Sequence, residues 1–548
     1  MKRKPFLLTI ALLVASVVST SCMATGESQS SSKKESQTSA AESVLESETV
    51  KESASVSESS SEMKEIVITD EQIAQGYTRY DVTTSLARKT EGFGTQFDTL
   101  IVEKENRLTE EEWQLQIDAL KEMNLQNVRI RFYPEMYERA NDNDDPNTFD
   151  YFSKDVDFNS AEMNYLYRLL DVFEEEGVKV DLSWYGCRTT FDSVDGKYDG
   201  SWLGGKYGQD GINSWMVAPR LTENPEEEYA ESIAACLKYL YENKGYTCIN
   251  EISVFPEPEG VVGAGNVSQL FNIINSVKTR LIAMGLKDRV TISGPADYNN
   301  NSEVYAQKYL SSGVFEKGTS SVYPFGVDTE NAVMLDFAQG YAKVCNEYGI
   351  SWGVAECGTY NFLTPVTNKD SETYDRALFM AKFFTNMVNG GCTNIKYFVF
   401  SDCYYDGALN QLGLFKFRHD GFKAKPVWYS WSLLCKYTDI GSEVFPITVD
   451  YAPKSADDNM AITALKLPDG SWTYVAVNDS EKAKKIAIVN GRVDRPSQMN
   501  VFRLTGASIP EDGALKVIDP TTTVNGVAGV VYLTVPANGF LVVSDKPV

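Results

Sequence analysis

The sequence predicts a (β/α)8 barrel followed by a C-terminal antiparallel β-sandwich. From about residue 92 to residue 436, eight short apolar runs alternate with amphipathic stretches of helical period, which is typical of a parallel sheet. Roughly 345 residues for eight strand–helix units falls within the usual size range of such barrels. From about residue 440 the helical period gives way to short alternating segments separated by turns, which is typical of antiparallel strands.

The first four strands are separated by stretches with clear helix start and stop signals. Thr109 followed by three glutamates is a capping signal for the first helix, and Gly177 ends the second. Asn224-Pro opens the third helix. The expected strands are 92–97, 127–133, 178–184 and 248–255, and the expected helices are about 109–123, 161–176 and 224–243.

The remaining units continue the alternation, and a doubly wound open sheet is the structural alternative. No G-x-G-x-x-G motif follows the first strand, which disfavours that alternative. The expected helices are 267–284, 303–310, 332–348, 373–388 and 426–436, with strands at 289–293, 320–323, 351–356 and 394–400. The expected sandwich strands are 461–467, 472–477, 487–489, 530–535 and 540–543, with 65–69 as a candidate further strand.

The N-terminus predicts export and a lipid anchor. A basic start precedes an apolar run at 6–18 that is too short for a comfortable transmembrane helix. The run ends in Ser-Thr-Ser-Cys22, which resembles a bacterial lipoprotein cleavage site with lipid on Cys22. Ser19 stands where that site prefers leucine, so a plain signal-peptidase cut and secretion are the alternative.

These signals divide the sequence into four parts. Residues 1–22 are the lipoprotein signal peptide, and residues 23–75 are a Ser- and Glu-rich tether that cannot bury enough apolar surface to fold. The tether would hold a barrel at 76–438 and a β-sandwich at 439–548 away from the extracellular face of a bacterial membrane.

Composition excludes several classes of function. The net charge of -25 argues against nucleic acid and against an anionic membrane surface as partners, which leaves the lipid anchor as the membrane contact. The single histidine, His419, makes a His-rich metal site impossible and disfavours a metal-dependent barrel hydrolase. We therefore expect no metal and no organic cofactor; the sequence leaves the oligomeric state open.

Two glutamates stand at the ends of apolar runs expected to be buried strands. Glu257 lies in Val-Phe-Pro-Glu-Pro-Glu-Gly, and Glu356 lies in Trp-Gly-Val-Ala-Glu-Cys-Gly. A carboxylate at the end of a core strand is costly unless it has a partner or a function. Both fall at the C-terminal ends of barrel strands, where the active sites of such barrels lie.

These motifs resemble those of the (β/α)8 retaining glycoside hydrolases of clan A, such as families 5, 30 and 39. The resemblance covers roughly residues 90–440, and it implies that Glu257, after strand 4, is the acid/base and that Glu356, after strand 7, is the nucleophile. It also implies that Arg129, with Arg131 as an alternative, keeps the nucleophile charged, and that Tyr323 contacts the nucleophile through its hydroxyl. The resemblance extends to a C-terminal sandwich like that of families 30 and 39.

One position departs from the pattern of the clan. Pro256 stands where the clan has an asparagine whose amide contacts the sugar 2-hydroxyl. An unusual 2-position in the substrate, a substitute donor, lost activity or a different register would each account for the proline. If the register is different, Glu259 is the second candidate for the acid/base after Glu257, and Glu251 is the third.

Aromatic and polar residues near the strand ends are candidate sugar contacts, because sugar rings stack on exposed aromatic faces and their hydroxyls need polar partners. Trp184 and Trp202 are the preferred platforms, and Asp402 is the preferred polar partner. Gln96, Asp98 and Asp297 are further polar candidates.

The sequence therefore predicts a retaining glycoside hydrolase acting on β-glycosidic bonds of an extracellular poly- or oligosaccharide through Glu257 and Glu356. The alternative is a carbohydrate-binding surface lipoprotein whose barrel has lost catalysis, and Pro256 is the residue that favours it.

Overall fold

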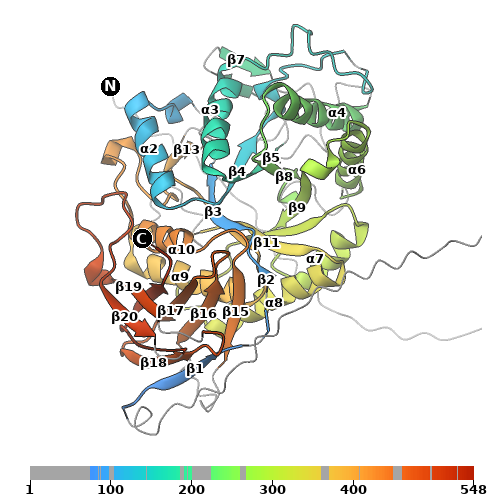
Figure 1. Ribbon diagram of the computed structural model, residues 1–548. Coiled ribbons are helices and arrows are strands. Elements are labelled where there is room, and N and C mark those ends of the chain that lie inside the picture. The colour runs from blue at the N-terminus through green and yellow to red at the C-terminus, as the bar shows by residue number, and fades with distance from the viewer. Residues whose placement is uncertain are drawn as a thin grey trace, which may run out of the picture. The chain divides into compact units, whose positions relative to one another are not determined.

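The computed structural model contains a closed eight-stranded parallel barrel and a second, mainly antiparallel sheet (Figure 1). It describes residues 75–83, 85–86, 88–97, 104–143, 145–185, 190–193, 196–199, 224–258, 267–358, 369–405, 408–448, 459–493, 497–526 and 529–547. The barrel strands close in the order β10-β11-β12-β3-β4-β5-β8-β9. The predicted fold class, a (β/α)8 barrel with a C-terminal β-sandwich, is confirmed.

The eight barrel strands follow the predicted order along the chain. They are β3 (Gly92–Phe97), β4 (Asn127–Phe132), β5 (Lys179–Trp184), β8 (Ile249–Val254), β9 (Thr291–Asp297), β10 (Lys317–Val322), β11 (Ser351–Cys357) and β12 (Asn394–Tyr397). The fifth strand begins and ends later than the predicted 289–293. Closure pairs β12 with β3, for example Ile395 with Phe93, and so brings the two ends of the barrel segment side by side.

The helices between these strands begin and end at the signals in the sequence. Thr109 and Glu112 form the predicted capping box, and Gly177, with φ +68°, ends α3 in the left-handed conformation that favours glycine. The longer helices are α2 (Glu110–Glu122), α3 (Ala161–Glu176), α4 (Pro225–Lys238), α6 (Val267–Ala283), α7 (Ser302–Lys308), α8 (Asn331–Glu347), α9 (Tyr374–Asn389) and α10 (Pro426–Lys436).

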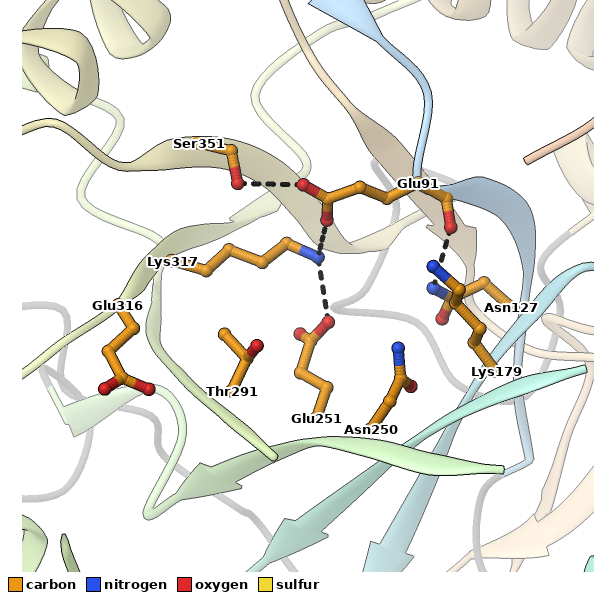
Figure 2. Close-up of a pocket in the computed structure, with 9 residues that line it drawn as sticks. All are labelled: Glu91, Asn127, Lys179, Asn250, Glu251, Thr291, Glu316, Lys317 and Ser351. Carbon is orange, nitrogen blue, oxygen red and sulfur yellow. Dashed lines mark hydrogen bonds and ion pairs between the residues drawn. The ribbon is translucent and has the colours of Figure 1, made fainter. Parts of the chain in front are cut away.

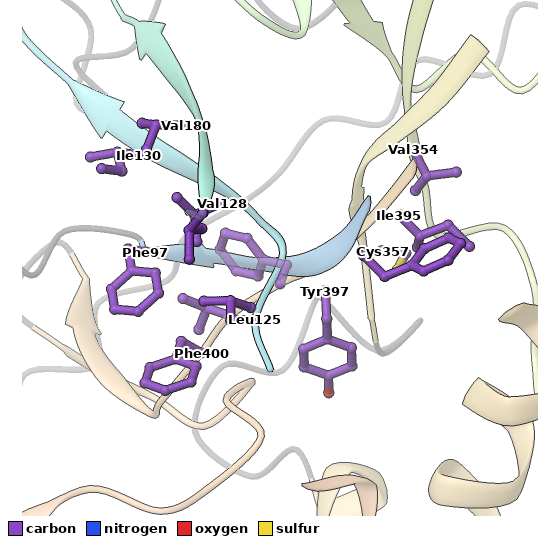
Figure 3. Close-up of a cluster of buried hydrophobic side chains, with 14 of the residues drawn as sticks. Phe97, Leu125, Val128, Ile130, Val180, Val354, Cys357, Ile395, Tyr397 and Phe400 are labelled. Atoms are coloured by element: carbon purple, nitrogen blue, oxygen red, sulfur yellow. The ribbon is translucent and has the colours of Figure 1, made fainter. Parts of the chain in front are cut away.

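Alternation along the barrel strands separates an apolar outer layer from a polar lumen. In β4, Val128 and Ile130 belong to the large buried apolar cluster (Figure 3), whereas Arg129 between them bonds polar residues of neighbouring strands. Successive strand residues point to opposite faces of a sheet. The apolar residues therefore pack toward the helices, and the charged residues between them fill the barrel.

The second sheet has ten strands in the described chain, and nine follow the order β20-β19-β22-β17-β16-β15-β1-β18-β21. Its strands are β1 (Thr78–Val82), β2 (Arg88–Lys89), β15 (Glu443–Thr448), β16 (Met460–Lys466), β17 (Trp472–Asn478), β18 (Lys484–Val489), β19 (Ser497–Thr505), β20 (Thr522–Gly526), β21 (Val530–Val535) and β22 (Gly539–Ser544). All pairs are antiparallel except β1 with β18. β1 and β2 join this sheet although they precede the first barrel strand.

Polar contacts connect α9 of the barrel to this second sheet. Lys382 on α9 forms an ion pair with Asp479, and Asn389 donates a hydrogen bond to the Ile462 carbonyl at 2.8 Å. Within the described residues, no helix combines the length and apolar character needed to cross a membrane. The candidate lipidation residue Cys22 and the segments 1–22 and 65–69 lie outside the described residues.

Candidate active site

Glu356 lies near the C-terminal end of β11, held by two side chains from other strands. Arg129 on β4 donates to Glu356 Oε1 at 2.5 Å, and Tyr323, directly after β10, donates to Glu356 Oε2 at 3.2 Å. The Glu356 residue is 3% exposed. Hydrogen bonds from these two donors offset the cost of burying the Glu356 carboxyl group.

Arg129 is itself fixed from several sides. Its guanidinium donates to Gln96 Oε1 at 3.0 Å, to Ser183 Oγ at 3.0 and 3.2 Å and to Tyr185 Oη at 3.3 Å. Burial opposes the charge of Arg129, but Tyr185 and the Glu356 carboxylate outweigh it and raise the pKa of Arg129. Arg131, the alternative, stacks over the Tyr185 ring with a centroid distance of 4.3 Å and donates to Tyr185 Oη at 3.5 Å.

Glu257 follows β8 in a strained backbone segment. Phe255 and Glu257 have φ values of +50° and +56°, a region that side chains other than glycine rarely adopt. Two hydrogen bonds hold the turn, from Phe255 N to the Trp184 carbonyl at 2.8 Å and from Glu257 N to the Pro295 carbonyl at 2.9 Å. Such strain is found where a function requires a fixed side-chain position.

The two glutamates act on each other electrostatically. Burial and the negative charge of Glu356 raise the pKa of Glu257 to about 8, while Arg129 opposes the rise. Ser321, which pairs with Glu356 in register, lies at a register shift between β10 and β11, and such irregularities re-aim side chains near active sites. At neutral pH Glu257 therefore carries its proton, beside a second carboxyl group that accepts hydrogen bonds from Arg129 and Tyr323.

A column of alternating charges continues from Arg129 through the barrel. Asp181 Oδ2 lies 3.8 Å from Arg129 Nε and 2.9 Å from Lys396 Nζ, and Lys396 Nζ lies 3.4 Å from Glu251 Oε1. Lys317 then bridges Glu251 Oε2 at 2.8 Å and Glu91, which precedes β3, at 2.6 Å. This buried charge column spans the lumen from the Glu356 end to the opposite mouth.

The column ends at a polar cavity of about 230 Å³ at the N-terminal ends of the barrel strands (Figure 2). Figure 2 shows Lys317 between the carboxylates of Glu91 and Glu251. Although burial raises it, the pKa of Glu251 is lowered overall by its two lysine neighbours. Glu251 is thus deep in the barrel and unsuited to donate a proton at neutral pH, so we discard this third-ranked acid/base candidate.

The structure corrects two of the expected sugar contacts. Trp184 is 0% exposed and packs edge-on against Phe132 at a ring distance of 4.9 Å, so it has no face available to a sugar. Asp402 is 2% exposed, and its Oδ1 accepts from Lys425 Nζ at 2.6 Å and from Gly413 N at 2.8 Å. Both residues are parts of the interior.

The other expected contacts divide between the interior and the part of the chain not described. Gln96 and Asp297 are each 0% exposed and bond Arg129 and Tyr341 respectively. Trp202, Asp98 and Glu259 lie outside the described residues.

Sequence reasoning missed Asp181 and Lys396, the two charges that link Arg129 to the rest of the column. Each stands between apolar residues of a strand, and that position was the available signal. An isolated charge inside a barrel strand needs a buried partner of opposite sign.

The assembled groups can carry out acid–base and nucleophilic chemistry. A carboxyl group of raised pKa after β8 and a second carboxyl group near the end of β11 are the kinds of group that cleave glycosidic bonds. The groups bonded to Glu356 are a guanidinium and a phenol, neither of which is a typical metal ligand.

Comparisons with known proteins give matches among solved structures. No family model and no curated protein sequence matches the chain. The catalytic domain of the GH30 xylanase C from Talaromyces cellulolyticus superposes with a TM-score of 0.59 at 13% identity, covering 85% of this chain and 99% of that one. A GH39 β-xylosidase from Caulobacter crescentus gives 0.55 at 14% identity, covering 86% and 100%.

A third match is an endo-β1,6-glucanase with a TM-score of 0.56 at 13% identity, covering 86% of this chain and 94% of the other. The resemblance to families 30 and 39 is thus confirmed for the fold, across the barrel and the second sheet together. The chain has the fold of the clan A glycoside hydrolases.

Proposed function

We propose that the protein is a retaining glycoside hydrolase that cleaves β-glycosidic bonds of an extracellular poly- or oligosaccharide. The observation that carries the proposal is the arrangement around Glu356. This carboxylate is bonded on one oxygen to Arg129 and on the other to Tyr323, beside Glu257 with its raised pKa. The fold shared with xylanases, a xylosidase and a glucanase supports a carbohydrate as the substrate.

In the first step Glu257 donates its proton to the glycosidic oxygen while Glu356 attacks the anomeric carbon. The bond to the leaving oxygen breaks, the leaving sugar departs as an alcohol, and a glycosyl ester forms on Glu356. Arg129 fixes the direction of the Glu356 carboxylate before the attack through its hydrogen bond. Tyr323 stabilises the attacking carboxylate in the same way through its hydroxyl.

In the second step the roles of Glu257 reverse. Esterification removes the negative charge of Glu356, and that charge is one of the causes of the raised pKa of Glu257. Glu257 is therefore better able to remain ionised in the glycosyl-enzyme, where it must accept a proton from water. The water attacks the anomeric carbon, releases Glu356 as a carboxylate and completes a double displacement with net retention.

The proposed setting is the extracellular face of a bacterial membrane. The export signal at 1–22 and the candidate lipid attachment at Cys22 support it, with secretion as the alternative. In this proposal residues 23–75 are the tether, 76–438 the catalytic barrel and 439–548 the sandwich.

A second candidate function is carbohydrate binding without turnover, and Pro256 favours it. The proline has no side-chain amide to contact a sugar 2-hydroxyl. If this candidate were correct, Glu356→Gln would leave glycan binding unchanged and there would be no turnover to lose.

Chemical rescue tests the proposal and the two roles together. Glu257→Ala and Glu356→Ala are assayed with activated aryl β-glycosides of several sugars, with and without azide. We expect azide to give a β-glycosyl azide with the Glu257 variant and an α-glycosyl azide with the Glu356 variant, because the intermediate forms only when Glu356 is present. Glu303→Gln, at the exposed start of α7, is the control and should keep full activity.

Two results would contradict this assignment. One is wild-type protein that binds glycans but turns over no glycoside in the panel. The other is the same azide product from both variants.

A further inference from the structure

A second cluster of carboxylates lies away from Glu257 and Glu356, where the loop after β4 meets the first turns of α4. Asp142 comes from the loop, and Glu228 and Glu231 come from one face of the helix. One oxygen from each of the three lies within 4.8 Å of the others. Glu228 and Glu231 are 2% and 3% exposed, so solvent water does little to stabilise a negative charge on either side chain.

Three buried oxygens of this acidic cluster lack hydrogen-bond donors. Both carboxylate oxygens of Glu231, and Oδ1 of Asp142, are buried with no hydrogen-bond partner. The basic group that acts on Glu231 is Arg280, which is already bonded to Glu227 at 2.9 Å. Burying an ionised carboxylate without a partner costs a large amount of free energy. A bound cation at these oxygens would offset that cost.

Neutral donors bond two other oxygens of the cluster. Asn143 Nδ2 donates to Asp142 Oδ2 at 3.1 Å, and the backbone N–H of Asp150 bonds the same oxygen. Asn141 Nδ2 donates to Glu228 Oε2 at 3.0 Å. Oδ2 of Asp142 is thus occupied by donors while Oδ1 lies buried without one.

A fourth carboxyl group lies beside the cluster, and burial together with the charges of Asp142, Glu231 and Glu228 raises its pKa. Glu138 is 1% exposed and accepts a hydrogen bond from Ser232. Burial and the charges of Asp142 and Glu228 raise the pKa of Glu231 to about 8, while Arg280 opposes the rise.

The donor chemistry selects the cation. All available ligand atoms are oxygens, which suit hard cations. Ca²⁺ binds oxygen at about 2.3–2.6 Å, so two oxygens on one Ca²⁺ lie up to about 5 Å apart, whereas the limit for Mg²⁺ is about 4.2 Å. The three oxygens lie within 4.8 Å of one another, which one Ca²⁺ can span, and Ca²⁺ accepts irregular oxygen sites, whereas Mg²⁺ demands near-ideal octahedral geometry and gives up its waters reluctantly. The single histidine of the chain does not argue against such a site, because all of its ligands would be oxygens.

We propose that Asp142, Glu228 and Glu231 bind a Ca²⁺ ion that ties the loop after β4 to the start of α4. The ion would replace mutual repulsion in the cluster with three carboxylate contacts. Because binding is to the folded chain, it should stabilise the fold in proportion to the calcium concentration. The inference is independent of the proposed glycosidase activity.

The test uses the full-length chain, stripped with EDTA, and two readouts that do not depend on activity. Isothermal titration with CaCl2 counts bound ions, and thermal unfolding measures the shift in Tm. At a hundredfold excess of calcium over its Kd, we expect Tm to rise by about 4 °C for a barrel of this size. MgCl2 at the same concentration should give a clearly smaller rise.

Glu231→Gln and Asp142→Asn are the diagnostic variants, and Glu303→Gln is the matched control. Both diagnostic variants should bind one Ca²⁺ fewer than wild type and lose the Tm rise, while the control keeps both. Without metal, Glu231→Gln should be about as stable as wild type, because the amide replaces a buried side chain whose raised pKa keeps it mostly protonated at neutral pH.

Three results would overturn the proposal. One is wild-type protein with no calcium response. Another is the full response in both diagnostic variants. The third is a metal-free Glu231→Gln variant with a markedly lower Tm than metal-free wild type.

Discussion

The buried charge column makes a quantitative prediction about Lys396. The Lys396 side chain is 0% exposed and lies between Asp181, at 2.9 Å, and Glu251, at 3.4 Å. Replacing it with methionine keeps the approximate volume of the side chain but removes the charge. Of the two ion pairs of Asp181 described above, only the one with Arg129, at 3.8 Å, then remains.

The size of the effect follows from the geometry. With an effective dielectric constant of about 20, a pair at 2.9 Å contributes about 6 kcal/mol of attraction and a pair at 3.4 Å about 5 kcal/mol. Loss of the desolvation cost of Lys396 offsets a large part of this. Breaking a buried pair from one side typically costs about 3–5 kcal/mol, and we expect Lys396→Met to fall in that range.

A double-variant cycle separates charge pairing from packing. Lys396→Met leaves one unbalanced negative charge in the column, whereas Lys396→Met combined with Asp181→Leu restores the balance. Free energies of unfolding from urea titrations, followed by tryptophan fluorescence, give the coupling between the two sites. We expect the double variant to be more stable than the sum of the single variants predicts by about 2 kcal/mol or more.

The reasoning would be refuted by a Lys396→Met variant within 1 kcal/mol of wild type, a threshold set by the typical effect of a neutral substitution. Strict additivity in the cycle would refute it as well, because the two residues would then not interact.

Three further predictions concern the candidate site. The kcat/KM should fall as pH rises through about 8, because Glu257 must be protonated to act as the acid and its pKa is raised to about 8; an alkaline limb unchanged in Glu257→Gln would contradict this. Tyr323→Phe removes one hydrogen bond to Glu356 and should lower kcat by about 10–100-fold, measured with aryl glycosides, without lowering Tm by more than a few degrees. Asp402→Ala leaves the buried Lys425 without its carboxylate and should cost about 3–5 kcal/mol of stability with KM unchanged, whereas a raised KM in a stable variant would restore Asp402 as a sugar contact.

The fold could be predicted because its signals are local. Helix limits such as Thr109 and Gly177 are set by capping chemistry within a few residues, and eight alternating units leave few architectures. The pairing of β1 with β15 and β18 could not be predicted in the same way, because the partners lie hundreds of residues away. Nothing in the residues 78–82 indicates which distant strand edge they join.

For the site, strand position was more informative than residue type. Glu356 stands at the strand end that the sequence indicated, and its contacts with Arg129 and Tyr323 are those expected from the resemblance. Trp184 was mistaken for a platform although it alternates with Ser183, which faces the lumen. The side chain must therefore point outward with Leu182 into the apolar layer.

Asp402 shows the other limit of the sequence. Its partner Lys425 is more than twenty residues away in the chain, and no local pattern joins the two. The charge column has the same character, because closure of the barrel brings Lys396 within reach of Asp181, which lies more than two hundred residues earlier.

The central claim is that Glu356 forms a covalent bond with the sugar. The most direct measurement is incubation with a panel of 2-fluoro β-glycosides carrying good leaving groups, followed by peptide mapping with mass spectrometry. The account predicts a single stable label on Glu356, and the sugar that labels identifies the substrate class. A label on Glu257, or on any other carboxylate in place of Glu356, would contradict it.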